Sequence, residues 1–277
     1  MIIKAENLSY TYAEGGPFEI GALHGVSLTI GKGELVGVIG HTGSGKSTLV
    51  QHFNGLLKPT AGSVTVCGVD TSAKRADLKA VRQKVGLVFQ YPEHQLFEET
   101  VRRDIAFAPQ NLGLSPTEID ARVREAAALT GLPEALLDQS PFALSGGQKR
   151  RAAIAGVLAM KPEVLVLDEP TAGLDPRGRE EILAQIKALH RETDITVILV
   201  SHGMEDIANT VGRVFVMNQG TIAMEGAPLA VYSRYEQLEQ MGLTAPQVTR
   251  LMKTLCGVDV CTVKQAKEYL LGVLRRA

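Results

Sequence analysis

The run GHTGSGKST at residues 40–48 constrains the fold of this chain more than any other feature, because it matches the phosphate-binding pattern G-x-x-x-x-G-K-[ST]. It follows the short apolar run Leu35–Ile39, which is typical of a strand buried on both faces, and a helix is predicted from about Lys46 to Leu56. Glycines let successive backbone N–H groups turn toward one anion, and the helix adds the partial positive charge of its N-terminus. A glycine-rich turn without a ligand is the alternative, but the flanking strand and helix favour a phosphate site.

Within this loop the charged and hydroxyl residues have separate uses. Lys46 can place a mobile positive charge between the β and γ phosphates of a nucleotide, and the Ser47 hydroxyl can ligate Mg²⁺. His41 occupies a position at which the pattern accepts any residue. The residues predicted to bind phosphate are Gly40, His41, Thr42, Gly43, Ser44, Gly45, Lys46, Ser47 and Thr48.

A pair of acidic residues follows a second apolar run, VLVLDEP at residues 164–170. Four apolar residues place Asp168 at the carboxyl end of a buried strand, which is the edge of an α/β sheet where ligands bind. Asp168 is predicted to orient Mg²⁺, and Glu169 to polarise an attacking water. The alternative is a strand that ends in two solvated acids, and the phosphate loop makes that reading the weaker one.

A second helix start with the character of an anion site lies at residues 144–150, LSGGQKR. Its serine is a good N-cap, and the two glycines leave backbone N–H groups open. We expect Ser145, Gly146, Gly147 and Gln148 to contact a nucleotide. An isolated S-G-G is usually a turn, so this prediction depends on the other two motifs.

Strand and helix patterns alternate along most of the chain, which predicts a mainly parallel sheet wrapped by helices. Residues 101–160 are instead mostly helical in pattern, with a strong helix start at Ser115, and read as an inserted subdomain of about residues 91–160. From about Glu225 the apolar spacing changes to that of a small helical piece. We therefore expect a domain at 1–225 and a helical extension at 226–277.

Composition excludes several classes of function. The net charge is −1, aromatic residues are 5% and tryptophan is absent, so nothing favours nucleic acid as a partner. The cysteines are odd in number and no cluster of histidines accompanies them, which argues against a disulfide framework or a zinc site. Neither an N-terminal targeting segment nor a run of 18 apolar residues is present, so we expect a chain that does not span a membrane.

Phosphate loop, LSGGQ and VLVLDEP, in this order and at this spacing, resemble the nucleotide-binding subunits of ATP-binding-cassette (ABC) transporters over roughly residues 1–225. The resemblance implies a P-loop NTPase fold with a RecA-like core, an N-terminal antiparallel β region and an inserted helical subdomain. It also implies ATP hydrolysis with Mg²⁺ by two subunits packed head to tail. Each ATP then lies between the phosphate loop of one subunit and the LSGGQ of the other.

Further residues take their roles from this resemblance. His202, after a predicted strand, would contact the γ-phosphate and hold the attacking water together with Glu169. Gln90 would reach Mg²⁺ and the same water, and Ser47, Gln90 and Asp168 would be the metal ligands. Tyr12 resembles the aromatic residue that stacks on adenine, with Tyr10 as the alternative. Residues 172–175, AGLD, resemble the loop that links the two sites across the dimer, although Ala-Gly replaces the more usual Ser-Ala.

The segment QYPEHQLFEETV at residues 90–101 resembles, within the ABC family, the ATPases of energy-coupling-factor importers for vitamins, cobalt or nickel, and more closely the second of their two ATPases. The resemblance implies a second ATPase subunit, a membrane coupling protein and a membrane substrate-binding protein as partners, at the cytoplasmic face of the membrane. Leu96 and Phe97 would face the coupling protein, or else only pack inside the helical subdomain. The ATPase of another ABC importer, or a nucleotide-sensing regulator, remains the alternative.

Overall fold

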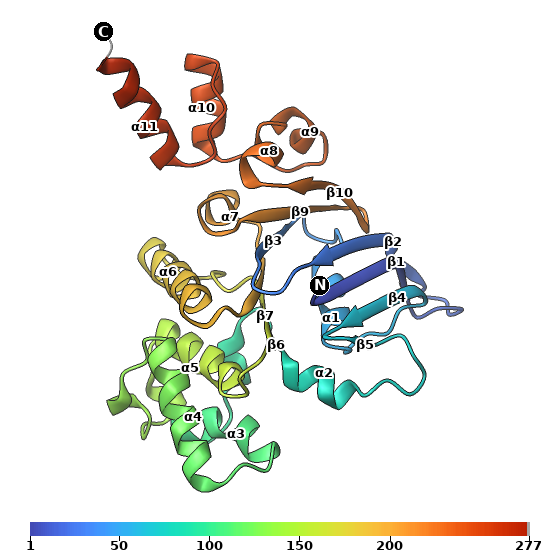
Figure 1. Ribbon diagram of the computed structural model, residues 1–277, viewed down its shortest axis with the longest axis vertical. Coiled ribbons are helices and arrows are strands. Elements are labelled where there is room, and N and C mark those ends of the chain that lie inside the picture. Colours follow the sequence, from blue (N-terminus) through green and yellow to red (C-terminus); the bar gives the residue numbers. More distant parts are fainter. Residues whose placement is uncertain (276–277) are drawn as a thin grey trace.

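A six-stranded sheet forms the centre of the computed structural model, which describes residues 1–275 (Figure 1). From one edge to the other its strands are β10 (Thr221–Gly226), β9 (Arg213–Asn218), β3 (Leu35–Ile39), β8 (Thr196–Val200), β7 (Val164–Asp168) and β6 (Val85–Val88). All neighbouring pairs are parallel except β10 and β9. The strands β7 and β8 are buried along their whole length, which explains their continuous apolar sequences.

A second, antiparallel sheet is built by the N-terminal part of the chain. Its order is β2 (Ile20–Ile30), β1 (Ile3–Tyr12), β4 (Ala61–Val66) and β5 (Val69–Asp70). Apolar side chains of this sheet, of the central sheet and of α1 (Lys46–Phe53) form one buried cluster that includes Ile3, Val38 and Leu49. The helix that carries the phosphate loop is therefore held by both sheets.

Three helices flank the sheets: α2 (Leu78–Lys84), α6 (Pro176–Thr193) and α7 (Met204–Thr210). The helix α6 has a well-formed start, because Asp175 accepts a hydrogen bond from the Gly178 backbone N–H at 2.7 Å and Pro176 occupies the first turn. Its apolar face, which includes Ile182, Ile186 and Leu189, is buried in a core that it shares with strands of the central sheet.

The middle of the chain forms a group of helices at one end of the molecule (Figure 1), namely α3 (Val101–Asn111), α4 (Pro116–Leu129) and α5 (Gly146–Leu158). The short 3₁₀ helix η1 (Pro92–Gln95) precedes α3, and η2 (Glu134–Leu136) and η3 (Pro141–Ala143) lie between α4 and α5. Both α4 and α5 start with a complete capping box, formed by Ser115 with Glu118 and by Ser145 with Gln148. Their apolar side chains share one core with β7 and α6, so this group is packed firmly on the central sheet.

Four helices follow the last strand: α8 (Pro228–Tyr232), α9 (Tyr235–Gln240), α10 (Gln247–Cys256) and α11 (Val263–Leu274). The first two join the main core through Val231, Tyr232 and Leu238. The last two lie at the opposite end of the molecule from α3–α5 and have a small core of their own around Met252 (Figure 1). Several of their apolar side chains stay exposed, among them Leu251, Leu255, Val263 and Leu274.

The observed architecture confirms the predicted α/β class, the N-terminal antiparallel region and the helical middle. The helix predicted to run from Lys46 to Leu56 ends earlier, at Phe53, because the chain turns at Gly55, whose φ of 67° is left-handed. The last strand, β10, ends at Gly226, and α8 begins at Pro228.

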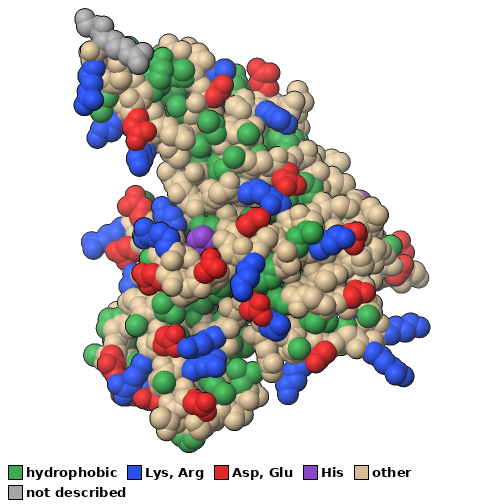
Figure 2. Space-filling model, viewed as in Figure 1, with side chains coloured by type: hydrophobic (Ala, Val, Ile, Leu, Met, Phe, Trp, Pro, Cys, Tyr) green, Lys and Arg blue, Asp and Glu red, His purple; other side chains and the backbone are tan. Residues whose placement is uncertain are grey.

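Charged side chains of both signs are interspersed over the face shown in Figure 2, in keeping with the net charge of −1. No helix within residues 1–275 is both long enough and apolar enough to cross a membrane.

Candidate functional site

The phosphate loop is curled around the side chain of Lys46. Its Nζ donates to the carbonyl oxygens of Gly40 at 2.8 Å and His41 at 3.0 Å. The turn needs glycine at position 45, since φ is 98° there and a Cβ atom would lie 2.7 Å from the backbone oxygen of Ala22. Burial lowers the pKa of Lys46, and the charges of Glu169 and Asp168 act in the opposite direction.

A cavity of about 550 Å³ opens in front of this loop. It brings together most of the residues predicted from the sequence, although they come from five separate parts of the chain. The lining residues are Tyr12, Ile20, Gly21, Ala22, Thr42, Gly43, Gly45, Lys46, Ser47, Thr48, Gln90, Asp168, Glu169 and His202. Gly40, His41 and Ser44 belong to the loop but do not line the cavity, and Ser44 is fully buried behind it.

Asp168 lies at the carboxyl end of β7, where its side chain is 6% exposed and faces Lys46 and Ser47. Burial raises the pKa of Asp168 above its ordinary value, and a hydrogen bond from the Ser47 side chain opposes that shift. A buried carboxylate with a neighbouring hydroxyl and an amide side chain (Gln90) offers the oxygen ligands that Mg²⁺ prefers. These residues therefore fit a magnesium ion that is completed by phosphate oxygens and water.

Glu169 and His202 form the second half of the site. His202 Nδ1 lies 2.6 Å from Glu169 Oε2, yet the ring N–H is not aligned on that oxygen, so Oε2 has no hydrogen-bond donor within residues 1–275. Glu169 has a left-handed backbone with φ of 53°, which is strained for a residue with a side chain, and its N–H is held by the Val200 carbonyl at 2.9 Å. A buried carboxylate oxygen without a donor can accept a proton from a water molecule.

The two tyrosines at the end of β1 differ in their surroundings. Tyr12 lines the cavity, is 39% exposed, and its hydroxyl lies 3.1 Å from Thr48 Oγ1. Tyr10 does not line the cavity and packs instead against the rings of Tyr12 and the buried His52. The geometry therefore favours Tyr12 as the ring that is open to a ligand, with Tyr10 supporting it from behind.

Gln90 is exposed and follows β6 by two residues. It lines the main cavity and also an adjoining one of about 290 Å³, whose lining residues include Tyr91, Gly173 and His202. The side chains at this place belong to the loop after β6, the loop after β7 and the loop after β8. Gln90 thus lies where the loops after β6, β7 and β8 meet.

Ser145, Gly146, Gly147 and Gln148 are not brought into this cavity. Ser145 is exposed and caps α5, with its N–H 2.9 Å from Gln148 Oε1 and its Oγ 3.4 Å from the Gln148 N–H. Nothing lies within 4 Å of where a Cβ atom of either glycine would be, so the helix start is open to a ligand. One chain thus presents two helix N-termini suited to bind an anion, at Gly45 and at Ser145. The first faces the chain's own cavity and the second does not.

Sequence reasoning missed two parts of the site. Ile20, Gly21 and Ala22 line the cavity from β2, and only the pairing of β2 with β1 brings them there. Arg150, on α5, is fully buried behind the loop after Glu169. The alternation of apolar and polar residues over Ile20–Ile30 could have placed Ile20, Gly21 and Ala22 on a strand. No local pattern marks Arg150 as buried.

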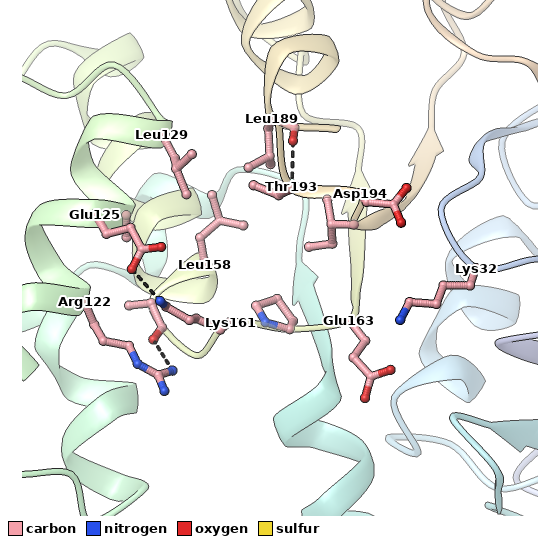
Figure 3. A pocket seen from close by; sticks show the side chains of 14 residues that line it. Lys32, Arg122, Glu125, Leu129, Leu158, Lys161, Glu163, Leu189, Thr193 and Asp194 are labelled. Carbon is pink, nitrogen blue, oxygen red and sulfur yellow. Dashed lines mark hydrogen bonds and ion pairs between the residues drawn. The ribbon is translucent and has the colours of Figure 1, made fainter. Parts of the chain in front are cut away.

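A different cavity, of about 290 Å³, lies at the opposite edge of the central sheet, where β7 and β8 begin (Figure 3). None of the residues predicted to bind nucleotide lines it. Three of its charged side chains have partners of their own: Lys161 pairs with Glu125 at 2.6 Å, and Arg122 donates to the Ala159 and Met160 carbonyls. We read this cavity as a packing groove between α4 and α6.

A phosphate loop, two carboxylates and a histidine at the carboxyl edge of a mainly parallel sheet define a P-loop ATPase of the ABC type. The ABC transporter family model matches residues 23–172, and the chain belongs to this family. Within it, the chain is 54% identical to the energy-coupling factor transporter ATP-binding protein EcfA2 of Caldanaerobacter subterraneus, over 99% of this chain and 98% of that one. It is 55% identical to the EcfA2 of Acetivibrio thermocellus, over the full length of both.

Solved structures agree with this assignment. CbiO1 from Clostridium perfringens, part of the ABC transporter complex CbiONQ, is 39% identical, covers 91% of this chain and 98% of its own, and superposes with a TM-score of 0.77. A dimeric ATP-binding cassette in a post-hydrolysis state, bound to ADP and Pi, is 33% identical, covers 82% and 98%, and has a TM-score of 0.72. The chain is therefore an ATP-binding subunit of the energy-coupling-factor type, an ATPase coupled to transport, and the predicted family, fold and enzyme class are confirmed.

Proposed function

We propose that this chain is one half of a head-to-tail ATPase pair, in which each ATP lies between the cavity at Lys46 of one subunit and the helix start at Ser145 of the other. The observation that carries the proposal is the separation of these two anion-type helix starts within one chain. An open, capped helix N-terminus attracts an anion, and this one does not line the cavity at Lys46. A partner chain that supplies the nucleotide completes it, and a dimeric cassette bound to ADP and Pi among the similar structures supports this pairing.

The residues of the cavity divide the work of hydrolysis. Tyr12 stacks on the adenine, and the phosphate loop with Lys46 binds the phosphates. Glu169 accepts the proton of a water whose oxygen bonds to the γ-phosphorus as the bond to ADP breaks, giving ADP and phosphate. His202 and Gln90 hold that water and the γ-phosphate in line. Ser47, Asp168 and Gln90 would hold Mg²⁺, which supplies charge neutralisation to the phosphates when bound.

Closure of the pair on binding ATP can drive transport only if it moves a membrane protein to which the pair is bound. We assign the pair to an importer with a membrane coupling protein and a membrane substrate-binding protein, peripheral at the cytoplasmic face, that takes up a vitamin or a cobalt or nickel ion. Phe97 and Phe107 support a partner surface: they are 60% and 44% exposed and form an edge-to-face pair at 5.1 Å in the helical group next to Gln90. Residues 1–225 would carry the ATPase domain, with the helical subdomain at about 91–160, and 226–277 the extension.

Ser145→Arg tests the shared site. The added side chain blocks the helix start but touches nothing in the chain's own cavity, so the dissociation constant of a fluorescent ATP analogue should stay unchanged. Turnover of the complex isolated with its partners should fall by about 100-fold, because the missing donors stabilise charge in the transition state.

Ser115→Arg is the matched control for this experiment. Ser115 caps α4 with the same kind of capping box as Ser145, but no nucleotide residue is predicted there. This variant should lose some stability and keep its turnover. Normal turnover of Ser145→Arg, or loss of ATP binding by its own chain, would refute the shared site.

A further inference from the structure

Arg150 is the largest fully buried side chain of the described residues, at 1% exposure, and it carries a full charge. A charge in the interior persists only when it is paired and hydrogen-bonded. Here Nη2 donates to both carboxylate oxygens of Glu93, at 2.9 and 3.1 Å, and Nη1 donates to the backbone oxygens of Pro170 at 2.9 Å and Ala172 at 2.8 Å. One guanidinium thus joins three segments that are far apart in the sequence.

Each of these segments carries a residue of a nucleotide site. Arg150 is on α5, five residues after Ser145, which faces the partner's ATP in the proposed pair. Glu93 is in η1, three residues after Gln90. Pro170 and Ala172 lie one and three residues after Glu169.

The link between Gln90 and Glu93 is stiff. Tyr91 has a left-handed backbone with φ of 57°, which is costly for a side chain of this size, and the ring of Pro92 fixes the next φ. Only Tyr91 and Pro92 separate Gln90 from Glu93, so a shift of Gln90 moves Glu93 as well. From Glu93 the shift reaches α5 through the bidentate ion pair with Arg150, whose geometry tolerates little displacement.

A buried ion pair is a poor source of net stability, because desolvation of both charges offsets their attraction. Its specific value is to select one arrangement of the segments that it joins. The hydrogen bonds from Nε, Nη1 and Nη2 of Arg150 to Glu93, Pro170 and Ala172 select one orientation of α5 relative to the loops after β6 and β7.

We propose that Arg150 and Glu93 are positioning residues that couple the hydrolytic side of this chain's site, at Gln90 and Glu169, to the helix start that the same chain offers to its partner's ATP. This inference rests on the proposed head-to-tail pair. Neither side chain lines the cavity, so neither touches the chain's own nucleotide. Both act through the segments that they hold.

Glu93→Gln tests the coupling with the smallest change of shape. The dissociation constant for ATP should stay unchanged, because the phosphate loop is intact. The kcat of the isolated complex should fall about tenfold, and the Hill coefficient for ATP should drop toward one, because the loss of a coupling interaction is of this order. A purely structural role would instead lower the melting temperature and leave the Hill coefficient as it is.

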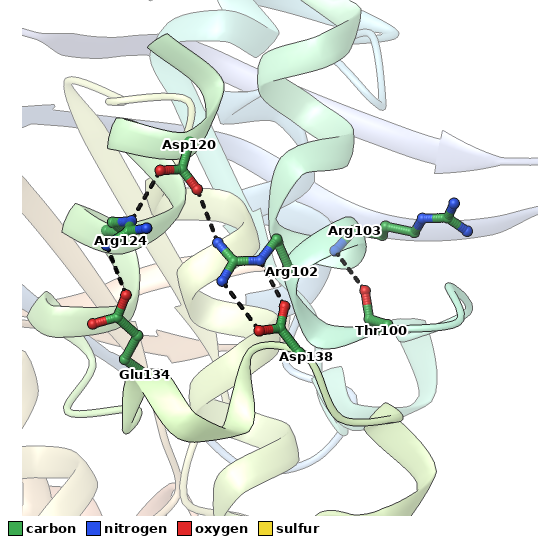
Figure 4. A network of polar contacts seen from close by, with 7 residues as sticks. All are labelled: Thr100, Arg102, Arg103, Asp120, Arg124, Glu134 and Asp138. Atoms are coloured by element: carbon green, nitrogen blue, oxygen red, sulfur yellow. Dashed lines mark hydrogen bonds and ion pairs between the residues drawn. The ribbon is translucent and has the colours of Figure 1, made fainter. Parts of the chain in front are cut away.

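The matched control is Asp138→Asn, in the same helical group (Figure 4). Asp138 accepts from Arg102 Nε at 2.8 Å, and Arg102 also pairs with Asp120 on α4, so this network stays within the helices and their connections. Its removal should leave kcat and the Hill coefficient unchanged. Arg150→Lys should behave like Glu93→Gln, because an ammonium group cannot make the bidentate contact.

The wild-type complex and Ser145→Arg are measured beside these variants. Should the wild type not turn over ATP, or Ser145→Arg not block turnover, the proposed pair itself fails. When both behave as expected, unchanged kcat and Hill coefficient in folded Glu93→Gln overturn the coupling. If Glu93→Gln does not fold, Glu93→Asp, which keeps the charge and shortens the reach, carries the same expected result and the same refutation.

Discussion

His202 Nδ1 lies 2.6 Å from Glu169 Oε2, although the two residues follow different strands of the central sheet. The contact brings the predicted base and the predicted γ-phosphate sensor together at the mouth of the cavity. Glu169 is nearly buried, whereas the side chain of His202 is 71% exposed. The carboxylate is thus shielded in the site, and the imidazole is open to what approaches it.

Glu169→Gln is the sharpest test of this arrangement. The amide keeps the shape of the side chain but cannot take a proton from water, so turnover should fall by about 100-fold or more. ATP binding should be retained, and size-exclusion chromatography with ATP should show the pair trapped in the closed form. Unchanged turnover would remove Glu169 from the mechanism.

Lys46→Ala should abolish tight ATP binding, since it removes both a charge on the phosphates and the donor that holds the loop carbonyls of Gly40 and His41. Titration with a fluorescent ATP analogue measures the effect. Lys58→Ala is the control, because Lys58 does not line the cavity and its Nζ makes a long contact, at 3.4 Å, to the Ala73 carbonyl. Wild-type affinity in Lys46→Ala would contradict the role of the loop.

The burial of Asp168 predicts that the melting temperature of the chain depends on pH. Since burial raises its pKa, the folded chain holds this proton more tightly than the unfolded chain does. The resulting stabilisation is full below the unfolded pKa of about 3.9 and is lost as pH rises through the folded pKa. Asp168→Asn should therefore raise the melting temperature of the nucleotide-free, chelator-treated chain at pH 7 by about 2 °C or more, and by less as pH falls toward 4.

Asp138→Asn is the comparison in the same melting-temperature measurement, because the pKa of Asp138 is shifted in the opposite direction to that of Asp168. The hydrogen bond from Arg102 lowers the pKa of Asp138, so its contribution is present above the unfolded pKa and is lost as pH falls. This substitution should not raise the melting temperature at pH 7. A melting temperature of Asp168→Asn that is equal to or below that of the wild type at pH 7 would show that burial does not penalise Asp168.

Local signals explain what could be predicted from the sequence. The strand at 35–39 has its expected bounds and the helix after Ser115 has its expected start, because apolar runs and caps depend on neighbouring residues only. The carboxyl-edge rule then places Asp168, Glu169 and His202 together, since their strands β7 and β8 are adjacent and parallel.

Long-range contacts explain what could not be predicted. Arg150 and Glu93 are 57 residues apart, and two arginines in a row after GGQ have the pattern of a solvated helix surface. Only the packing of α5 against η1 turns one of them inward, while Arg151 remains near the surface and pairs with Glu181. The sequence could not decide between Tyr12 and Tyr10 for the same reason. Both lie on β1, and only their contacts with α1, at Thr48 and His52, distinguish them.

Tyr12→Ala should weaken ATP binding by about 2- to 10-fold, as expected when an aromatic contact of about 0.5–1.5 kcal/mol is removed. Tyr12→Phe keeps the ring and loses only the hydroxyl near Thr48, so it should bind ATP almost as well as the wild type. Tyr10→Phe serves as the control behind the site. A larger loss of affinity in Tyr10→Phe than in Tyr12→Ala would reverse the assignment.

Leu96 and Phe97 are neighbours with different surroundings, which makes them a matched pair for the membrane partner. Leu96 packs against the main core, whereas Phe97 is 60% exposed. Phe97→Ser should therefore leave the melting temperature and the ATP affinity of the isolated chain unchanged but release it from the coupling protein when the complex is purified from membranes. Leu96→Ser should destabilise the fold by about 2–3 kcal/mol, as expected for loss of apolar packing. Intact complexes with Phe97→Ser would place the partner surface elsewhere.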